Sequence, residues 1–170
     1  MPKLIKDRAV VDDSWMLLRG AASLADLPAE GPVIVPLALW LAQRDALLAR
    51  GDIGVWLAPN DEPGKIAADV AALSVIAVDF PQFTDGRGYS TGRLLRERFG
   101  YSGELRAIGD VHRDQLYYLS QCGFDAFALA NGHPLDAALA SLSDFADGYQ
   151  LTNRRTPWFR RRGPNHAVVE

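Results

Sequence analysis

Residues 75–90 read VIAVDFPQFTDGRGYS and place a buried strand directly before a polar, glycine-rich loop. The apolar run ends at Asp79, the sequence DGRG follows at residues 85–88, and a helix-period segment follows at residues 91–99. A buried strand that feeds a loop of this kind is where α/β proteins commonly place ligand-binding residues. The stretch therefore predicts both an α/β fold and the position of a site.

The same alternation of a short apolar run and a helix-period segment recurs along the chain. Strands are expected at residues 33–35, 53–58, 74–78, 104–108 and 125–129, each followed by a helix, at residues 37–48, 60–70, 91–99, 111–122 and 135–146. Such alternation implies parallel strands joined by right-handed crossovers. We predict an α/β domain in which about five strand–helix units form an open sheet or an incomplete barrel. A complete eight-stranded barrel needs roughly 200 residues or more, which this chain lacks.

The N-terminal residues and the C-terminal tail lie outside these five units. Residues 9–12 and 15–18 are expected to add one or two strands. With 170 residues, 48% of them hydrophobic, and a net charge of −3, the chain is expected to form a single α/β domain over residues 1–152. Residues 153–170 form a basic tail, which is expected either to pack on the domain or to be flexible. Nucleic-acid binding is not expected, because the overall charge is acidic and no nucleic-acid fold signature is present.

The cysteine and histidine content limits the chemistry that the chain can carry out alone. One cysteine, Cys122, excludes an internal disulfide and an all-cysteine metal or iron–sulfur site within one chain, and we expect it to be a buried structural thiol. His112, His133 and His166 lack metal-ligand spacing, so no metal site is predicted. His112 lies near Asp110, where it is able to act as an acid or a base. No apolar run approaches the ~20 residues of a membrane span, and a cytoplasmic protein is expected.

Four of the predicted strand ends carry polar residues. These are Asn60, Asp79, Asp110 and Asn131. If the strands are parallel, all four side chains share one edge of the sheet, which is where α/β proteins bind ligands. Asn and Asp also start turns and cap helices, so each residue has a purely structural alternative.

The loop after the strand at residues 74–78 has the features of an anion-binding site. The start of a helix offers free backbone N–H groups and the positive end of a dipole, and Arg87 and Arg93 would add cationic donors. Ser90 or Thr91 is predicted to cap this helix. The full candidate set of the loop is Asp85, Gly86, Arg87, Gly88, Ser90, Thr91 and Arg93. A phosphate, sulfate or carboxylate would fit. The alternative is a salt bridge from Arg87 to Asp79 or Asp85 that only holds the loop together.

The segment VDFPQFTDGRGYSTGRLLRERFGYSGELRAIGDVHRDQLYYLSQCGFDAF, residues 78–127, resembles the core of a bacterial family called domain of unknown function nine-three-four. Members of this family are described as oxidoreductases of sulfite reduction. The resemblance adds Gln82 to the candidate residues. The positions that carry the resemblance are Asp79, Phe80, Gln82, Asp85, Gly86, Arg87, Gly88, Tyr89, Ser90, Arg93, Arg106, Gly109, Asp110 and Gln115.

Two functional hypotheses follow from this resemblance. The first is an oxidoreductase or redox subunit of assimilatory sulfite reduction, with an anion-binding loop at residues 85–93. The second is a non-catalytic accessory module that binds the sulfite reductase. The sequence has no dinucleotide fingerprint, no redox cysteine pair, no cluster ligand set and no haem motif, so the cofactor is left unassigned.

Overall fold

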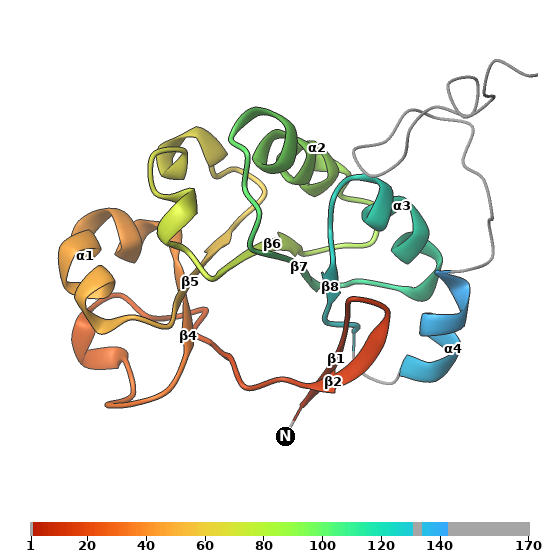
Figure 1. Cartoon of the computed structure of the whole chain (residues 1–170), viewed down its shortest axis with the longest axis horizontal. Helices are drawn as coiled ribbons and strands as arrows, with labels where there is room; N and C mark the ends of the chain where they lie inside the picture. Colours follow the sequence, from red (N-terminus) through yellow and green to blue (C-terminus); the bar gives the residue numbers. More distant parts are fainter. Residues whose placement is uncertain (1, 131–133, 143–170) are drawn as a thin grey trace, which may run out of the picture.

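A computed structural model describes residues 2–130 and 134–142, and it shows a single eight-stranded sheet that curls into a half-barrel (Figure 1). The strand order is β2-β1-β8-β7-β6-β5-β4-β3. The strands are β1 (Lys3–Lys6), β2 (Ala9–Asp12), β3 (Met16–Leu17), β4 (Val33–Pro36), β5 (Ile53–Leu57), β6 (Val75–Phe80), β7 (Glu104–Gly109) and β8 (Ala126–Phe127). The helices are α1 (Leu37–Arg50), α2 (Arg87–Arg93), α3 (Leu116–Gln121) and α4 (Leu135–Ser141). The predicted α/β fold is confirmed.

Neighbouring strands from β3 to β8 are all parallel, and helical segments connect β4 to β8 in chain order. β6, VIAVDF, lies at the centre, and all six of its residues are buried. Parallel strands covered on both faces have near-continuous apolar sequences of this kind. The carboxyl ends of these strands lie along one edge of the sheet, and the loops that follow β5, β6 and β7 begin there.

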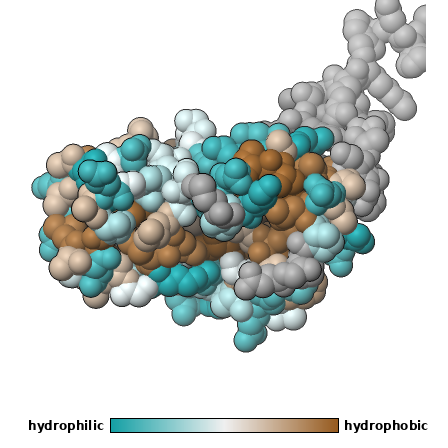
Figure 2. All heavy atoms as spheres, turned by 90° about the horizontal axis from the view of Figure 1, so that it is seen from below, coloured by the Kyte–Doolittle hydropathy of each residue, from teal (hydrophilic) through white to brown (hydrophobic). Residues whose placement is uncertain are grey.

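The two faces of the curled sheet carry different side chains. The convex face packs against the helices, with Trp40 of α1 and Phe80 of β6 fully buried in a large apolar core. The concave face has a smaller apolar cluster that includes Val75 and Ile108, with Trp56 packed against it. Figure 2, which views the molecule from below, shows a hydrophobic band on this side interrupted by hydrophilic residues. Of the buried polar residues in the described part of the chain, Asp79, Glu104 and Arg106 lie on the concave face of β6 and β7, whereas Asp69, Gln115 and Gln121 belong to the segments that cover the convex face.

The N-terminal segment contributes three strands, one more than the sequence analysis expected. β1 and β2 form a hairpin whose two turn residues, Asp7 and Arg8, have φ angles of 48° and 63°. Positive φ at both positions is the geometry of a type I′ turn, which matches the twist of the strands. β1 also pairs antiparallel with β8. This strand was missed because KLIK has only two apolar residues between lysines.

Two local predictions are wrong. The segment after β5 forms two short 3₁₀ turns, Pro63–Ile66 and Val70–Ala72, in place of one helix over residues 60–70. In addition, α2 starts at Arg87, so Ser90 and Thr91 lie inside the helix and do not cap it. Their hydroxyl groups had suggested a cap. The N-cap position is instead occupied by Gly86, which has no side chain to accept a hydrogen bond from the first turn of the helix.

Two glycines bring α2 close to the sheet. A Cβ atom on Gly88 would lie 2.5 Å from Cζ of Phe80, and one on Gly92 would lie 2.4 Å from Cε2 of Phe124. Both contacts are shorter than any real side chain tolerates. Gly88, which the sequence analysis placed in the candidate loop, permits this close helix–sheet contact because it has no Cβ atom.

Within the described residues, no helix is both long and apolar enough to cross a membrane. The candidate residue Asn131 and the basic tail at residues 153–170 lie outside the described residues. So does the end of the last predicted helix, because α4 is described only as far as Ser141.

Candidate functional site at the carboxyl edge of the sheet

Asp79 lies near the end of β6 on the concave face, where it is only 7% exposed. Its Oδ1 accepts a hydrogen bond of 2.8 Å from Nη2 of Arg19. The Arg19 guanidinium also lies 5.5 Å from the ring centroid of Trp56, within the range of a cation–π contact. Sequence reasoning did not propose Arg19, which follows β3 and is 60 residues away in the chain.

Asp85 and Arg87 form a two-point ion pair in the loop before α2. Nε of Arg87 donates to Oδ1 at 2.9 Å and Nη2 donates to Oδ2 at 2.6 Å. Its Nη1 donates to Oδ1 of Asn60, which comes from the loop after β5. Hydrogen bonding by Arg87 holds the pKa of the Asp85 carboxyl below its ordinary value. The salt-bridge alternative is thus present, with Asp85 and not Asp79 as the partner, and an incoming anion must compete with Asp85.

The loop after β7 also forms hydrogen bonds to the loop that contains Asp85 and Arg87. Asp110 accepts a 2.9 Å hydrogen bond from the backbone N–H of Phe83 and lies 2.7 Å from Nε2 of His112. Gln115 donates to the carbonyl of Phe83 at 3.3 Å. The exposed Gln82 contributes its carbonyl to a turn, accepting from the N–H of Asp85 at 2.9 Å. Residues 82–87 are therefore held from both neighbouring loops.

An aromatic surface borders this loop, and we call it the aromatic rim: Phe83, Tyr89, His112 and Tyr118. The ring of Phe83 lies 5.1 Å from that of His112, and the ring of Tyr89 lies 5.0 Å from that of Tyr118. The Tyr89 hydroxyl accepts a 3.1 Å hydrogen bond from Gln115, and burial raises the pKa of Tyr89. Phe83 and Tyr118 are nevertheless 47% and 44% exposed.

Arg93 and Cys122 lie together behind this surface. Arg93 ends α2, and Cys122 is fully buried after α3. Burial raises the pKa of the Cys122 thiol, although the nearby Arg93 acts in the opposite direction. A buried thiol with a raised pKa is a poor nucleophile, which agrees with the expected structural role.

The structure thus brings several of the predicted residues together. Asn60, Asp85 and Arg87 form one hydrogen-bonded group, and Asp110 joins them through the backbone of the loop. Asp79 pairs elsewhere, with Arg19, and Ser90 and Thr91 lie on α2. Within the described residues, no group of three or more His, Cys, Asp or Glu side chains is arranged to hold a metal ion.

A second group of charged side chains was not predicted as a site, although Arg106 was among the positions that carry the family resemblance. On the concave face, Arg106 and Glu104 of β7 are only 3% and 8% exposed, and they border a pocket of about 470 Å³ between β7 and the β1–β2 hairpin. The sequence Glu-Leu-Arg at residues 104–106 was the feature that could have indicated this charged pair. Residues i and i+2 of a strand share a face, so this spacing places the two charges side by side.

Comparison with known proteins supports the resemblance noted in the sequence. A search of curated proteins finds no match. Residues 54–159 match the model of a family described as bacterial protein of unknown function, DUF934. This region includes most of β5, all of β6 to β8, the loop at residues 82–87 and the aromatic rim. Since the match covers more than half of the chain, the protein belongs to the DUF934 family.

Proposed function

We propose that this protein is an accessory module of assimilatory sulfite reduction that binds the sulfite-reducing enzyme through the aromatic rim. The link to sulfite reduction comes from the family resemblance. The observation that carries a binding role is the exposure of Phe83 and Tyr118 on a surface whose backbone is fixed from two sides. Rigid aromatic side chains are typical anchors of protein interfaces, because they bury a large area at a small entropic cost.

The polar groups beside the aromatic rim are better suited to binding a protein partner than to binding a small anion. All three nitrogen groups of Arg87 already donate to Asp85 or Asn60. A sulfite or phosphate ion would have to displace Asp85 from a two-point pair. A protein partner can instead use the pair as it stands, as the polar border of an apolar contact.

Binding to the purified sulfite reductase tests this proposal. Phe83→Ala and Tyr118→Ala are expected to weaken binding at least tenfold when combined, which corresponds to about 1.4 kcal/mol. Leu41→Ala is the matched control, because Leu41 of α1 is also 47% exposed but lies outside the aromatic rim. Isothermal titration calorimetry with the full chain gives the affinities. Growth on sulfate as the sole sulfur source gives the cellular effect.

Three results would argue against the accessory role. Equal loss of binding in Leu41→Ala would mean that the aromatic rim is not the contact. A flavin or haem spectrum in the purified protein, or oxidation of reduced nicotinamide by it, would favour the redox-subunit hypothesis. Absence of any binding, together with normal growth of a deletion strain on sulfate, would remove both hypotheses.

A further inference from the structure

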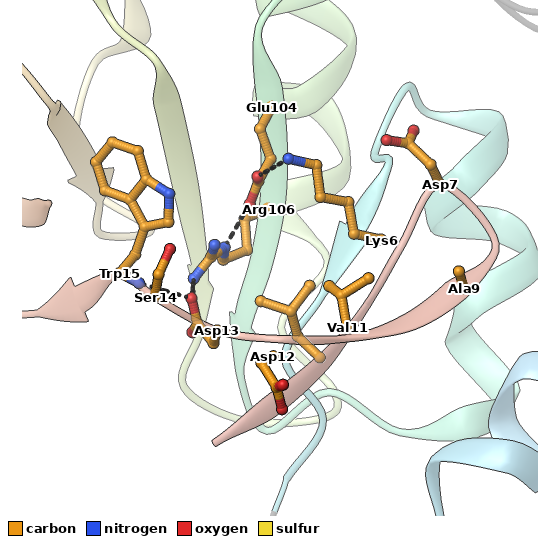
Figure 3. Close-up of a pocket in the computed structure, with 11 residues that line it drawn as sticks. Lys6, Asp7, Ala9, Val11, Asp12, Asp13, Ser14, Trp15, Glu104 and Arg106 are labelled. Atoms are coloured by element: carbon orange, nitrogen blue, oxygen red, sulfur yellow. Dashed lines mark hydrogen bonds and ion pairs between the residues drawn. The ribbon is translucent and has the colours of Figure 1, made fainter. Parts of the chain in front are cut away.

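A pocket of about 470 Å³ lies between the β1–β2 hairpin and the concave face of β7 (Figure 3). It faces the amino ends of the parallel strands, whereas the aromatic rim lies beyond their carboxyl ends. Its volume falls in the range of pockets that hold small molecules, about 300–1,000 Å³. The family match and the proposed docking role assign nothing to it.

The floor of the pocket is a chain of four charged side chains, of which Glu104, Arg106 and Asp13 are at most 12% exposed and Lys6 is 42% exposed. Arg106 donates through Nε to Glu104 at 2.7 Å and through Nη1 to Asp13 at 2.9 Å. The other carboxylate oxygen of Glu104 lies 2.8 Å from Nζ of Lys6, and this contact raises the pKa of Lys6. Figure 3 shows these side chains pointing toward one another across the floor. The two cations and two carboxylates balance one another.

One donor nitrogen of Arg106 takes no part in this chain of charges. Within residues 2–130 and 134–142, Nη2 of Arg106 donates no hydrogen bond, and although the residue is only 3% exposed, Nη2 is not among the fully enclosed side-chain atoms that lack a partner. A guanidinium N–H group that lines a pocket and has no acceptor in the protein is available to a ligand, and such groups pair readily with carboxylates. The pocket floor therefore favours a ligand that carries a carboxylate or a similar acceptor.

The more exposed part of the pocket favours a positively charged group. Asp7 at the hairpin turn and Asp12 at the end of β2 both line the pocket, both are exposed, and neither forms an ion pair in the described part of the chain (Figure 3). Together with the balanced floor, they give the pocket an excess of two negative charges, which attracts cations. Trp15 forms one wall. The flat face of an indole binds guanidinium groups, as Trp56 does for Arg19 in this protein.

We propose that this pocket binds a small zwitterion. Its carboxylate accepts a hydrogen bond from Nη2 of Arg106, and its amine or guanidinium group lies between Trp15 and Asp12. A simple anion lacks the group that the mouth favours, and a simple cation leaves Arg106 unsatisfied. Molecules of the amino-acid type meet both demands.

Three related small molecules test separately whether the carboxylate and the cationic group of the ligand are needed. L-arginine carries both groups, agmatine lacks the carboxylate, and L-citrulline replaces the guanidinium by a neutral urea. Isothermal titration calorimetry of the full-length protein is expected to show saturable binding of L-arginine with a Kd of ~1 mM or below. Agmatine and L-citrulline are each expected to bind at least about tenfold more weakly.

Two variants connect the binding to named residues. Asp12→Asn removes an exposed carboxylate and is expected to weaken L-arginine about tenfold without a change in the urea midpoint. Arg106→Lys keeps the charge but replaces three donor nitrogens by one, which cannot serve Glu104, Asp13 and a ligand together, so L-arginine should fall to the affinity of agmatine in a variant whose circular dichroism shows that it is folded. Asp45→Asn is the control, because the Asp45 side chain is 96% exposed and lies on α1.

The proposal fails on either of two results. The first is no detectable heat with any of the three probes at about 10 mM. The second is agmatine binding as tightly as L-arginine, which would indicate only an acidic surface. Since all titrations use the isolated protein, they do not depend on docking to the sulfite reductase.

Discussion

Two arginines of this chain pair with a carboxylate two residues earlier, and the two pairs lie in opposite environments. Asp85 and Arg87 belong to a surface loop, where the Arg87 side chain is 55% exposed. Glu104 and Arg106 belong to β7, where the two side chains are 5% and 3% exposed. The pattern in the sequence is the same, an acid, one residue, and an arginine. The backbone decides which pair faces water.

This difference in exposure determines what each pair does for the protein. Water and salt screen an exposed pair, so it contributes little to stability and mainly shapes the loop. A buried pair has lost its hydration, and each charge depends on its partner. We therefore expect substitutions in the two pairs to differ sharply in their effect on folding.

Arg106→Ala is expected to have the largest effect, a loss of about 3–5 kcal/mol in the free energy of unfolding. It leaves Glu104 with only Lys6 and leaves Asp13 without its cation in a site that is largely closed to water. Urea denaturation followed by circular dichroism measures the change. An effect as small as that of Arg87→Ala would mean that water reaches the pocket floor freely.

Gly88→Ala is expected to cost about 1–3 kcal/mol, because the added methyl group meets the ring of Phe80. Gly86→Ala is the matched control in the same loop, since the nearest atom to its added Cβ lies 4.0 Å away. The same urea denaturation compares the two variants. Equal effects would show that backbone freedom, and not close packing of α2, explains both glycines.

The sequence predicts the convex side of this fold better than the concave side. Long apolar runs such as β6 identify the parallel strands, and the helix-period segments locate the helices that cover them. Such runs show no alternation, so they do not reveal which side chains face inward. Glu104 and Arg106 were therefore placed in the correct strand without being recognised as a buried pair.

The candidate site was only partly predictable for a similar reason. The strand ends at Asn60 and Asp110 follow from the α/β pattern, and both contact the loop at residues 82–87. Arg19 follows β3 and reaches Asp79 only through the curl of the sheet, which no local pattern encodes. Exposure of Phe83 likewise depends on how three loops meet.

Arg87→Ala is expected to have the smallest effect on stability, with a urea midpoint close to that of the unmodified protein, because the pair is exposed. The change should appear instead in the Asp85 carboxyl, whose pKa lies below its ordinary value because Arg87 donates to it. Carbon-detected NMR titration should show this pKa rising toward the ordinary value of about 3.9 in the variant.

The sign of the pH dependence follows from that shift. Since the pKa of Asp85 is lowered in the folded protein, the stabilisation by the pair is present above the ordinary Asp pKa and is lost as the pH falls through the lowered value. The small difference in stability between Arg87→Ala and the unmodified protein should therefore be present near neutral pH and vanish at the most acidic pH. An unchanged Asp85 pKa in the variant would mean that the backbone N–H of residue 87, which also donates to Asp85, produces the shift alone.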